Sequence, residues 1–130
     1  MTEFVRRLRT AAAEPLAIVD AETGAVVARR VEAALTRTAR RRGLLSRDSL
    51  ADSHALAIAP CAAVHTVGMR FPIDVLFVSR GGRILKIVTD LPPWRIAGRL
   101  GAYAAVELAA GALRSCNVRV GDQLLLAPQV

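Results

Sequence analysis

The residues of this chain best suited to chemistry lie between positions 65 and 74, around a bend at Phe71-Pro72. An imidazole (His65), a guanidinium (Arg70) and a carboxylate (Asp74) could support acid–base chemistry or hold an anion. No reaction follows from these residue types, because none stands in a recognisable catalytic motif. The candidate ligand-binding residues are His65, Thr66, Met69, Arg70, Asp74, Trp94 and Glu107.

Two of these candidates are carboxylates in apolar surroundings, where an unpaired charge would cost several kcal/mol. Asp74 stands near the start of the apolar run 73–78. It could pair with Arg70 across the bend, accept hydrogen bonds from loop amides, or contact a ligand. Glu107 stands within VELAAG (106–111), and the arginine at 70, 95 or 99 could pair with it.

The other candidates also have structural alternatives. Met69 could fill the core or line a pocket. Trp94 follows two prolines and could anchor a ligand or cover one end of the core. His65 and Thr66 could be structural residues of a half-buried strand. No metal or cofactor is predicted, because one imidazole and two carboxylates do not make a typical ligand set.

The elements that must position these residues are mainly strands. Short apolar or alternating runs separated by Gly- and Pro-containing turns predict a compact β-sandwich or barrel-like domain with one or two short helices. Hairpin turns are expected at 22–24 and 80–83. Strands are expected at 54–59, 61–67, 73–78, 84–88, 102–108 and 121–126, and helices or helical turns at 36–45, 46–50 and 109–117. Residues 1–12 are expected to be a frayed or short helical segment.

The 130 residues, 53% of them hydrophobic, predict one domain with a single core. The net charge is +7, and all but one of the 18 basic residues are arginine. Most of the excess falls before residue 48, and no aromatic residues are interleaved with it. We therefore expect a solvated basic face, which could meet a protein partner, and not a nucleic-acid site.

The chain has no apolar run near the roughly 20 residues that span a bilayer, so no transmembrane segment is predicted. Arg6-Arg7 followed by alanines is weakly similar to an export leader, but Glu14, Pro15 and Asp20 interrupt it. A cytoplasmic protein is therefore the expectation. In that compartment the two cysteines, at positions 61 and 116, would be small buried thiols, with a bond between them as the alternative.

Six segments occur in one order along the chain: RRGLLSRDSL (41–50), HTVGMRFPIDVLFV (65–78), GGRILKI (81–87), Pro92-Pro93, VELAAG (106–111) and VGDQLLL (120–126). Together they resemble the domain of unknown function 192 (DUF192) family over about residues 33–127. The resemblance implies a compact, predominantly β domain. It implies no activity, since the family has none assigned. Many of its members are exported or membrane-tethered, so export stays open.

From these observations we expect a small binding or accessory module with a polar pocket at one end of the β core. A polar or anionic small ligand would suit Arg70 and its neighbours. One alternative is an assembly partner that uses the basic face. Another is a small hydrolase-type enzyme that uses His65 with Asp74 or Glu107, which requires those side chains to share one side of the sheet.

Overall fold

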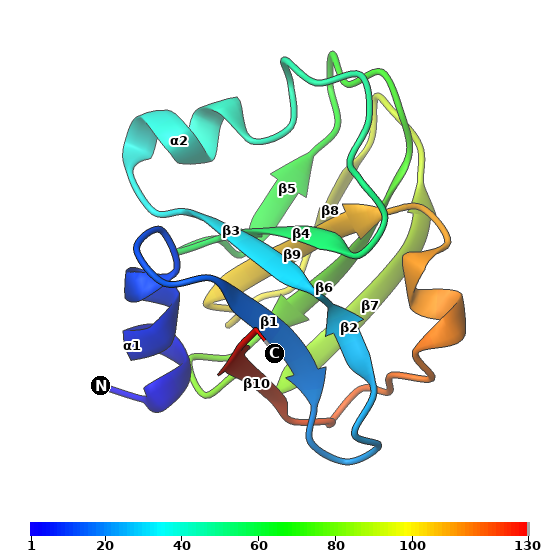
Figure 1. Cartoon of the computed structure of the whole chain (residues 1–130). Helices are drawn as coiled ribbons and strands as arrows, with labels where there is room; N and C mark the ends of the chain where they lie inside the picture. Colours follow the sequence, from blue (N-terminus) through cyan, green and yellow to red (C-terminus); the bar gives the residue numbers. More distant parts are fainter. Residues whose placement is uncertain (130) are drawn as a thin grey trace.

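A five-stranded sheet forms the centre of the computed structural model, which describes residues 1–129 (Figure 1). Its order is β3 (Arg30–Ala34), β4 (His54–Ile58), β9 (Ala104–Ala109), β6 (Ile73–Val78) and β7 (Ile84–Leu91). β3 and β4 are parallel, and the other neighbours are antiparallel. Every residue of β6 is buried, as its nearly continuous apolar sequence predicts for a strand covered on both faces.

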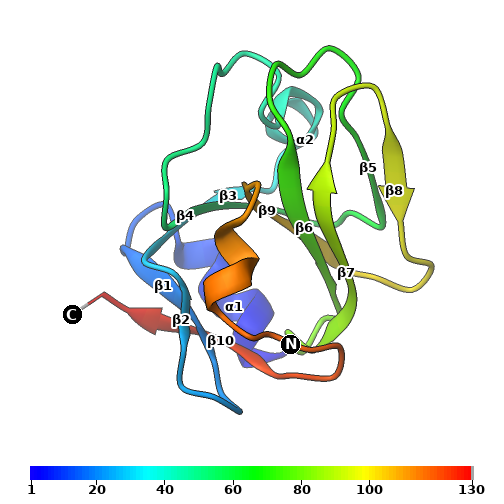
Figure 2. The same cartoon turned by 90° about the vertical axis from the view of Figure 1, so that its right-hand side faces the viewer.

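One face of this sheet is covered by a three-stranded sheet of β10 (Leu124–Pro128), β1 (Leu16–Asp20) and β2 (Val26–Ala28). The helices α1 (Glu3–Thr10) and η1 (Ala112–Ser115) lie on the same side, and Figure 2 shows β1, β2 and β10 away from β5 and β8. Because side chains alternate along a strand, this face receives Leu76, Val106 and Leu108. They pack against Leu16 and Leu124 in the first core cluster.

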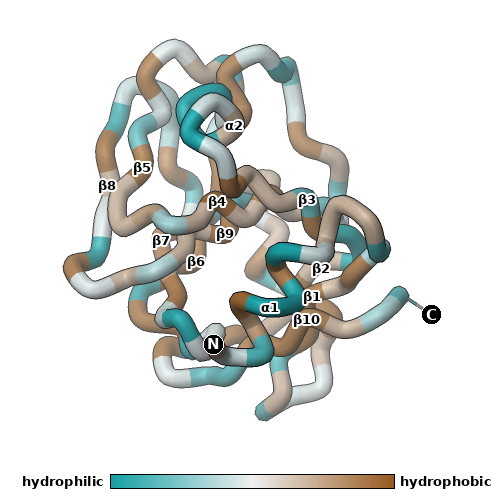
Figure 3. Tube along the Cα trace, turned by 90° about the vertical axis from the view of Figure 1, so that its left-hand side faces the viewer, coloured by the Kyte–Doolittle hydropathy of each residue, from teal (hydrophilic) through white to brown (hydrophobic). Residues whose placement is uncertain are grey.

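The opposite face is covered by α2 (Arg37–Arg42), the loop after it, and the two-stranded sheet of β5 (Ala63–His65) and β8 (Ile96–Gly98). Here the alternate residues Leu56, Val75 and Phe77 pack against Leu44 and Met69 in the second core cluster. α2 lies in the crossover between the parallel strands β3 and β4, which is why it reaches this face. In Figure 3 the teal colour on α2 marks its hydrophilic sequence.

The first residues of the chain are helical and packed, not frayed. The Thr2 hydroxyl oxygen accepts a hydrogen bond from the Val5 amide (3.2 Å), and Phe4, Val5 and Leu8 are buried. Phe4 lies against the β6–β7 turn at Gly82, whose φ is +84°. A Cβ at Gly82 would come within 2.6 Å of Phe4 Cδ1, so this turn needs glycine both for its conformation and for the space.

The prediction of a mainly β protein is confirmed, as are the hairpins at 22–24 and 80–83 and the strand at 102–108. The sheets formed by residues 1–129 do not close into a barrel. The predicted helical turn at 46–50 is wrong, and the last strand begins at Leu124 and not at residue 121. Both cysteines are free, with Cys116 buried and Cys61 half-buried. None of the helices within residues 1–129 has the length and apolar content needed to cross a membrane.

Candidate functional site

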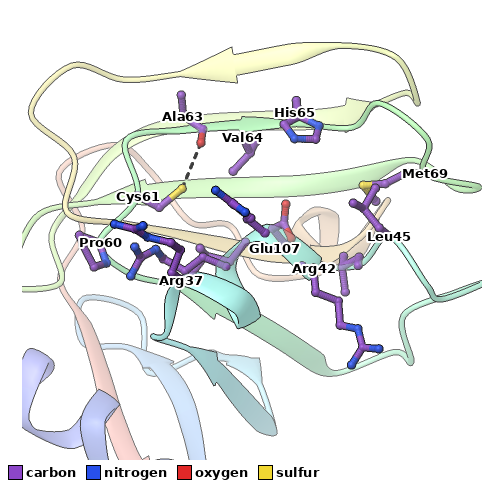
Figure 4. A pocket seen from close by; sticks show the side chains of 15 residues that line it. Arg37, Arg42, Leu45, Pro60, Cys61, Ala63, Val64, His65, Met69 and Glu107 are labelled. Carbon is purple, nitrogen blue, oxygen red and sulfur yellow. Dashed lines mark hydrogen bonds between the residues drawn. The ribbon is translucent and has the colours of Figure 1, made fainter.

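A pocket of about 370 Å³ opens between α2, the end of β4, and β5 (Figure 4). This volume lies at the lower end of the roughly 300–1,000 Å³ range of small-ligand sites. The lining combines apolar residues such as Leu44, Ile58 and Met69 with the polar side chains of Arg37, Arg40, Arg41, Arg42, Cys61, His65 and Glu107. The pocket therefore combines apolar walls with five charged side chains, four of them arginine.

Glu107 forms the floor of this pocket, at the centre of Figure 4. It stands in the middle of the central strand β9, between Leu56 of β4 and Val75 of β6 in the register. Only 3% of the residue is exposed. Burial raises the pKa of the Glu107 carboxyl to about 7, and among residues 1–129 Arg47 is the charged side chain that partly offsets this rise.

The Arg47 guanidinium already forms an ion pair with another carboxylate. Its guanidinium donates to both carboxylate oxygens of Glu32 on β3, at 2.8 and 3.4 Å, and this ion pair lowers the pKa of Glu32. Glu32, Leu56 and Glu107 follow one another across three neighbouring strands. Arg47 thus forms hydrogen bonds with the exposed carboxylate of Glu32, and it acts on the buried carboxyl of Glu107 only through its electrostatic field.

The Cys61 thiol lines the same pocket as the arginines and Glu107. It donates to the carbonyl of Ala63 at 3.1 Å (Figure 4). Burial is the main cause that raises the pKa of this thiol; the charge of Glu107 raises it further, while Arg40 lowers it. A thiol with a raised pKa is a poor nucleophile at neutral pH, so the environment of Cys61 favours a wall residue over a reactive one.

Asp74 lies on the other face of the sheet from Glu107. In the pairing of β6 with β9, Asp74 is opposite Leu108 of the first core cluster, and Glu107 is opposite Val75 of the second. The expectation that Asp74 and Glu107 join one site is therefore wrong, because neighbouring positions of a strand point to opposite faces. A catalytic pair of His65 with Asp74 is excluded as well, because β5 covers the face of the sheet opposite to the one that Asp74 faces.

The predicted ion pair of Arg70 with Asp74 is also wrong. Fully buried Asp74 accepts three backbone hydrogen bonds: Oδ1 from the Asp90 amide (2.9 Å), and Oδ2 from the Gly111 (3.1 Å) and Leu113 (3.2 Å) amides. The alternative of loop amides is thus the one that forms. Arg70 instead pairs with Asp48 on the surface.

The remaining candidates divide between the pocket and the surface. Met69 is buried and lines the pocket. His65 reaches the pocket only at its rim: in the β5–β8 register it pairs with Ile96, which is 77% exposed, while its neighbour Val64 points into the core. Trp94 is 66% exposed and does not line the pocket.

Comparison with known proteins agrees with this fold. The DUF192 family model, described as "Uncharacterized ACR, COG1430", matches residues 18–126. The chain belongs to the DUF192 family. The match begins at residue 18, ahead of residue 33, from which the resemblance in the sequence extends.

Two crystal structures share the fold of this DUF192 chain. A "putative transcription regulator" from Sinorhizobium meliloti 1021 is 24% identical with a TM-score of 0.76, over 87% of this chain and 92% of that one. A protein of unknown function from Novosphingobium aromaticivorans DSM 12444 is 22% identical with a TM-score of 0.73, over 85% of this chain and 83% of that one. At these identities the likeness shows a common fold and no more. No curated protein matches the chain.

In this DUF192 chain Thr66 holds the loop that carries Trp94. Its buried hydroxyl donates to the Pro92 carbonyl (2.6 Å) and accepts from the Arg95 amide (2.9 Å). Trp94, at a φ of +66°, donates its own amide to the Thr66 carbonyl at 3.0 Å. Thr66 is therefore a structural anchor for the loop in this structure.

We expect Thr66→Val to destabilise this DUF192 protein by about 2 kcal/mol, because it leaves the Pro92 carbonyl and the Arg95 amide without a partner. Urea denaturation measures the change, and the fluorescence anisotropy of Trp94, the only tryptophan, should fall as the loop loosens. Thr66→Ser retains the hydroxyl and should cost about 1 kcal/mol or less. Equal losses in the two variants would contradict the role given to the hydroxyl.

The α2 arginines and Cys61 are the pocket residues that sequence reasoning missed in the DUF192 chain. The run 40–42 predicts a helix with a solvated basic side, and nothing in it indicates that the helix lies over a buried glutamate. A second hollow, of about 590 Å³ between β1, β3 and β10, has Arg29, Arg30 and His54 in its lining. It is larger, but none of its lining residues is a buried polar side chain.

Proposed function

We propose that this protein is a small-ligand binding module, and that the pocket between α2 and Glu107 takes an anionic ligand. The observation that carries the proposal is the position of Glu107, a buried residue whose carboxyl faces the pocket. A carboxyl group that faces a pocket from the central strand, on a residue only 3% exposed, is costly for a purely structural position. A carboxyl whose pKa is shifted by desolvation and which faces a pocket is a candidate functional residue.

The charge of the rim supports an anion as ligand. Arg37, Arg40 and Arg41 line the pocket from one short helix, and guanidinium groups bind carboxylate and phosphate through two parallel hydrogen bonds. Arg40 donates one N–H to the Leu35 carbonyl (2.9 Å), which holds its side chain in place. Arg37 and Arg41 form no ion pair within residues 1–129.

Three features favour binding over hydrolysis. Asp74 is on the far face of the sheet, and the Cys61 thiol has a raised pKa. His65 at the rim and Glu107 on the floor share the pocket, but no hydrogen bond joins them within residues 1–129. A base oriented by a carboxylate, which acid–base catalysis at a nucleophile needs, is therefore not assembled.

The test is the binding of butyrate and inorganic phosphate, followed by NMR chemical shifts, to wild type and to Arg37→Ala/Arg41→Ala. We expect the double variant to bind the better of the two anions at least tenfold more weakly, since hydrogen bonds between charged groups contribute roughly 1.5–3 kcal/mol each and about 1.4 kcal/mol already corresponds to tenfold in affinity.

The matched control is Arg6→Ala/Arg9→Ala on α1, which removes two charges outside the pocket and should bind as wild type does. Equal losses in the two double variants would mean that net charge, and not the pocket, attracts the anion. Unchanged binding in Arg37→Ala/Arg41→Ala, or no binding of either anion to wild type, would reject the proposal.

A further inference from the structure

Glu107 occupies a position at which its neighbours predict an aliphatic side chain. The residues beside it in the register, Leu56 and Val75, are both buried and apolar. On its own strand the residues that point to the same face are Ala105 and Ala109, both of which pack in or against the second core cluster. These small residues leave space around the carboxyl, so the pocket reaches down to it.

The Glu107 carboxyl accepts no hydrogen bond from residues 1–129, and its oxygens remain open to the pocket, since they are not among the fully enclosed oxygens that lack a partner. Arg47, whose field reaches it, donates to Glu32 instead. Its oxygens are therefore free to accept hydrogen bonds from a molecule in the pocket.

The pocket has two poles, a positive one formed by the arginines of α2 and a separate one formed by the Glu107 carboxyl. The charge that acts on Glu107 is that of Arg47, which follows α2, and no arginine of α2 pairs with the carboxyl. The charges of Arg40 and Glu107 both act on the pKa of Cys61, in opposite directions, so its thiol lies near each of them. In Figure 4 Arg42 extends away from Glu107, Cys61 lies on one side of the carboxyl, and Met69 and Leu45 lie on the other.

Given the proposed binding function, we infer that the ligand has two ends, an anionic group bound by the α2 arginines and an amine or hydroxyl donor bound by Glu107. Small amino acids and hydroxy acids belong to this class. A dicarboxylate does not, because its second charge would face the Glu107 carboxyl. A plain monocarboxylate would leave Glu107 without a partner, as it is in the free protein.

The experiment compares four probes of similar length by NMR titration at about pH 8, where more of the Glu107 carboxyl is ionised. The probes are butyrate, γ-aminobutyrate, γ-hydroxybutyrate and succinate, each added to wild type, Glu107→Gln and the control Glu14→Gln on the surface. We expect the amine or the hydroxyl probe to bind wild type and Glu14→Gln about tenfold more tightly than butyrate, with succinate the weakest.

In Glu107→Gln the preference for γ-aminobutyrate over butyrate should fall to about twofold or less, and succinate should bind more tightly than it does to wild type. If butyrate binds wild type as well as both donor probes, or if Glu107→Gln keeps the preference, the two-ended ligand is rejected while the anion site stands. If none of the four probes binds wild type, the proposed binding function fails together with it.

Discussion

Asp74→Ala should destabilise the protein by about 4 kcal/mol, the largest effect we expect from a single substitution. The change leaves three amides without an acceptor: the buried amide of Leu113 and the partly buried amides of Asp90 and Gly111. A buried donor without a partner costs roughly 1–3 kcal/mol, and small domains have only about 5–15 kcal/mol of stability in total. Urea denaturation gives the free energy of unfolding directly.

The matched variant is Arg70→Ala. Because Arg70 is 65% exposed and pairs with the still more exposed Asp48, its removal should cost less than about 1 kcal/mol. An ion pair of Arg70 with Asp74 would instead make the two substitutions similarly costly. Equal losses in both variants would therefore contradict the hydrogen bonds assigned to Asp74.

Amide hydrogen exchange supplies a second measurement that does not depend on complete unfolding. Asp74→Asn retains the shape of the side chain but replaces one acceptor oxygen with a donor group. Exchange at the amides of Asp90, Gly111 and Leu113 should accelerate in this variant more than exchange at the central strand β9. Unchanged protection at these three amides would mean that they have other acceptors.

The difference between the predicted and observed partners of Asp74 has a physical cause. Local sequence predicts partners that are near in the chain, and Arg70 is four residues away. The actual donors are 16, 37 and 39 residues away, and they reach Asp74 only when β7 and η1 pack against β6. The β6–β7 hairpin itself could be predicted, because its turn and its apolar run are local features.

The pocket could be predicted only in part for a similar reason. The sequence singled out Glu107 because a carboxylate in an apolar strand requires an explanation. It could not supply the arginines opposite, because the position of α2 depends on the parallel pairing of β3 with β4. That pairing sends the connecting chain across one face of the sheet, and the basic helix with it. The positive charge of α2 can be predicted from its own sequence, whereas the residues that α2 covers depend on how the strands pair.

Glu107 should make the stability of the protein depend on pH in a direction opposite to that of most salt-bridged carboxylates. Its folded-state pKa, about 7, is above the value of 4.5 expected for an unfolded chain. The folded state therefore favours the protonated form, and the stability associated with it is fully present below about pH 4.5. It is lost as the pH rises through 7, by about 3 kcal/mol in total.

Glu107→Gln removes this titration while it retains the size of the side chain. The free energy of unfolding of the Gln variant, minus that of wild type, should therefore increase by about 3 kcal/mol between pH 4.5 and 8. Denaturation in urea at several pH values measures this difference, which cancels the contributions of the other ionisable groups. Glu14→Gln at the surface should give a difference that is nearly constant with pH.

Glu107→Leu is a second test of whether the buried carboxyl destabilises the folded protein. It replaces the carboxyl with an aliphatic side chain, the type that lies on both sides of Glu107 in the strand register. At pH 8 this variant should be more stable than wild type, since a buried ionised carboxyl is exchanged for apolar contacts with Leu56 and Val75. If Glu107 lowers the free energy of unfolding at neutral pH, the binding of a ligand to its carboxyl would offset that loss. If the free energies of unfolding of wild type and Glu107→Gln instead change in parallel with pH, the Glu107 carboxyl is solvated. That result would contradict the burial on which the proposed binding site rests.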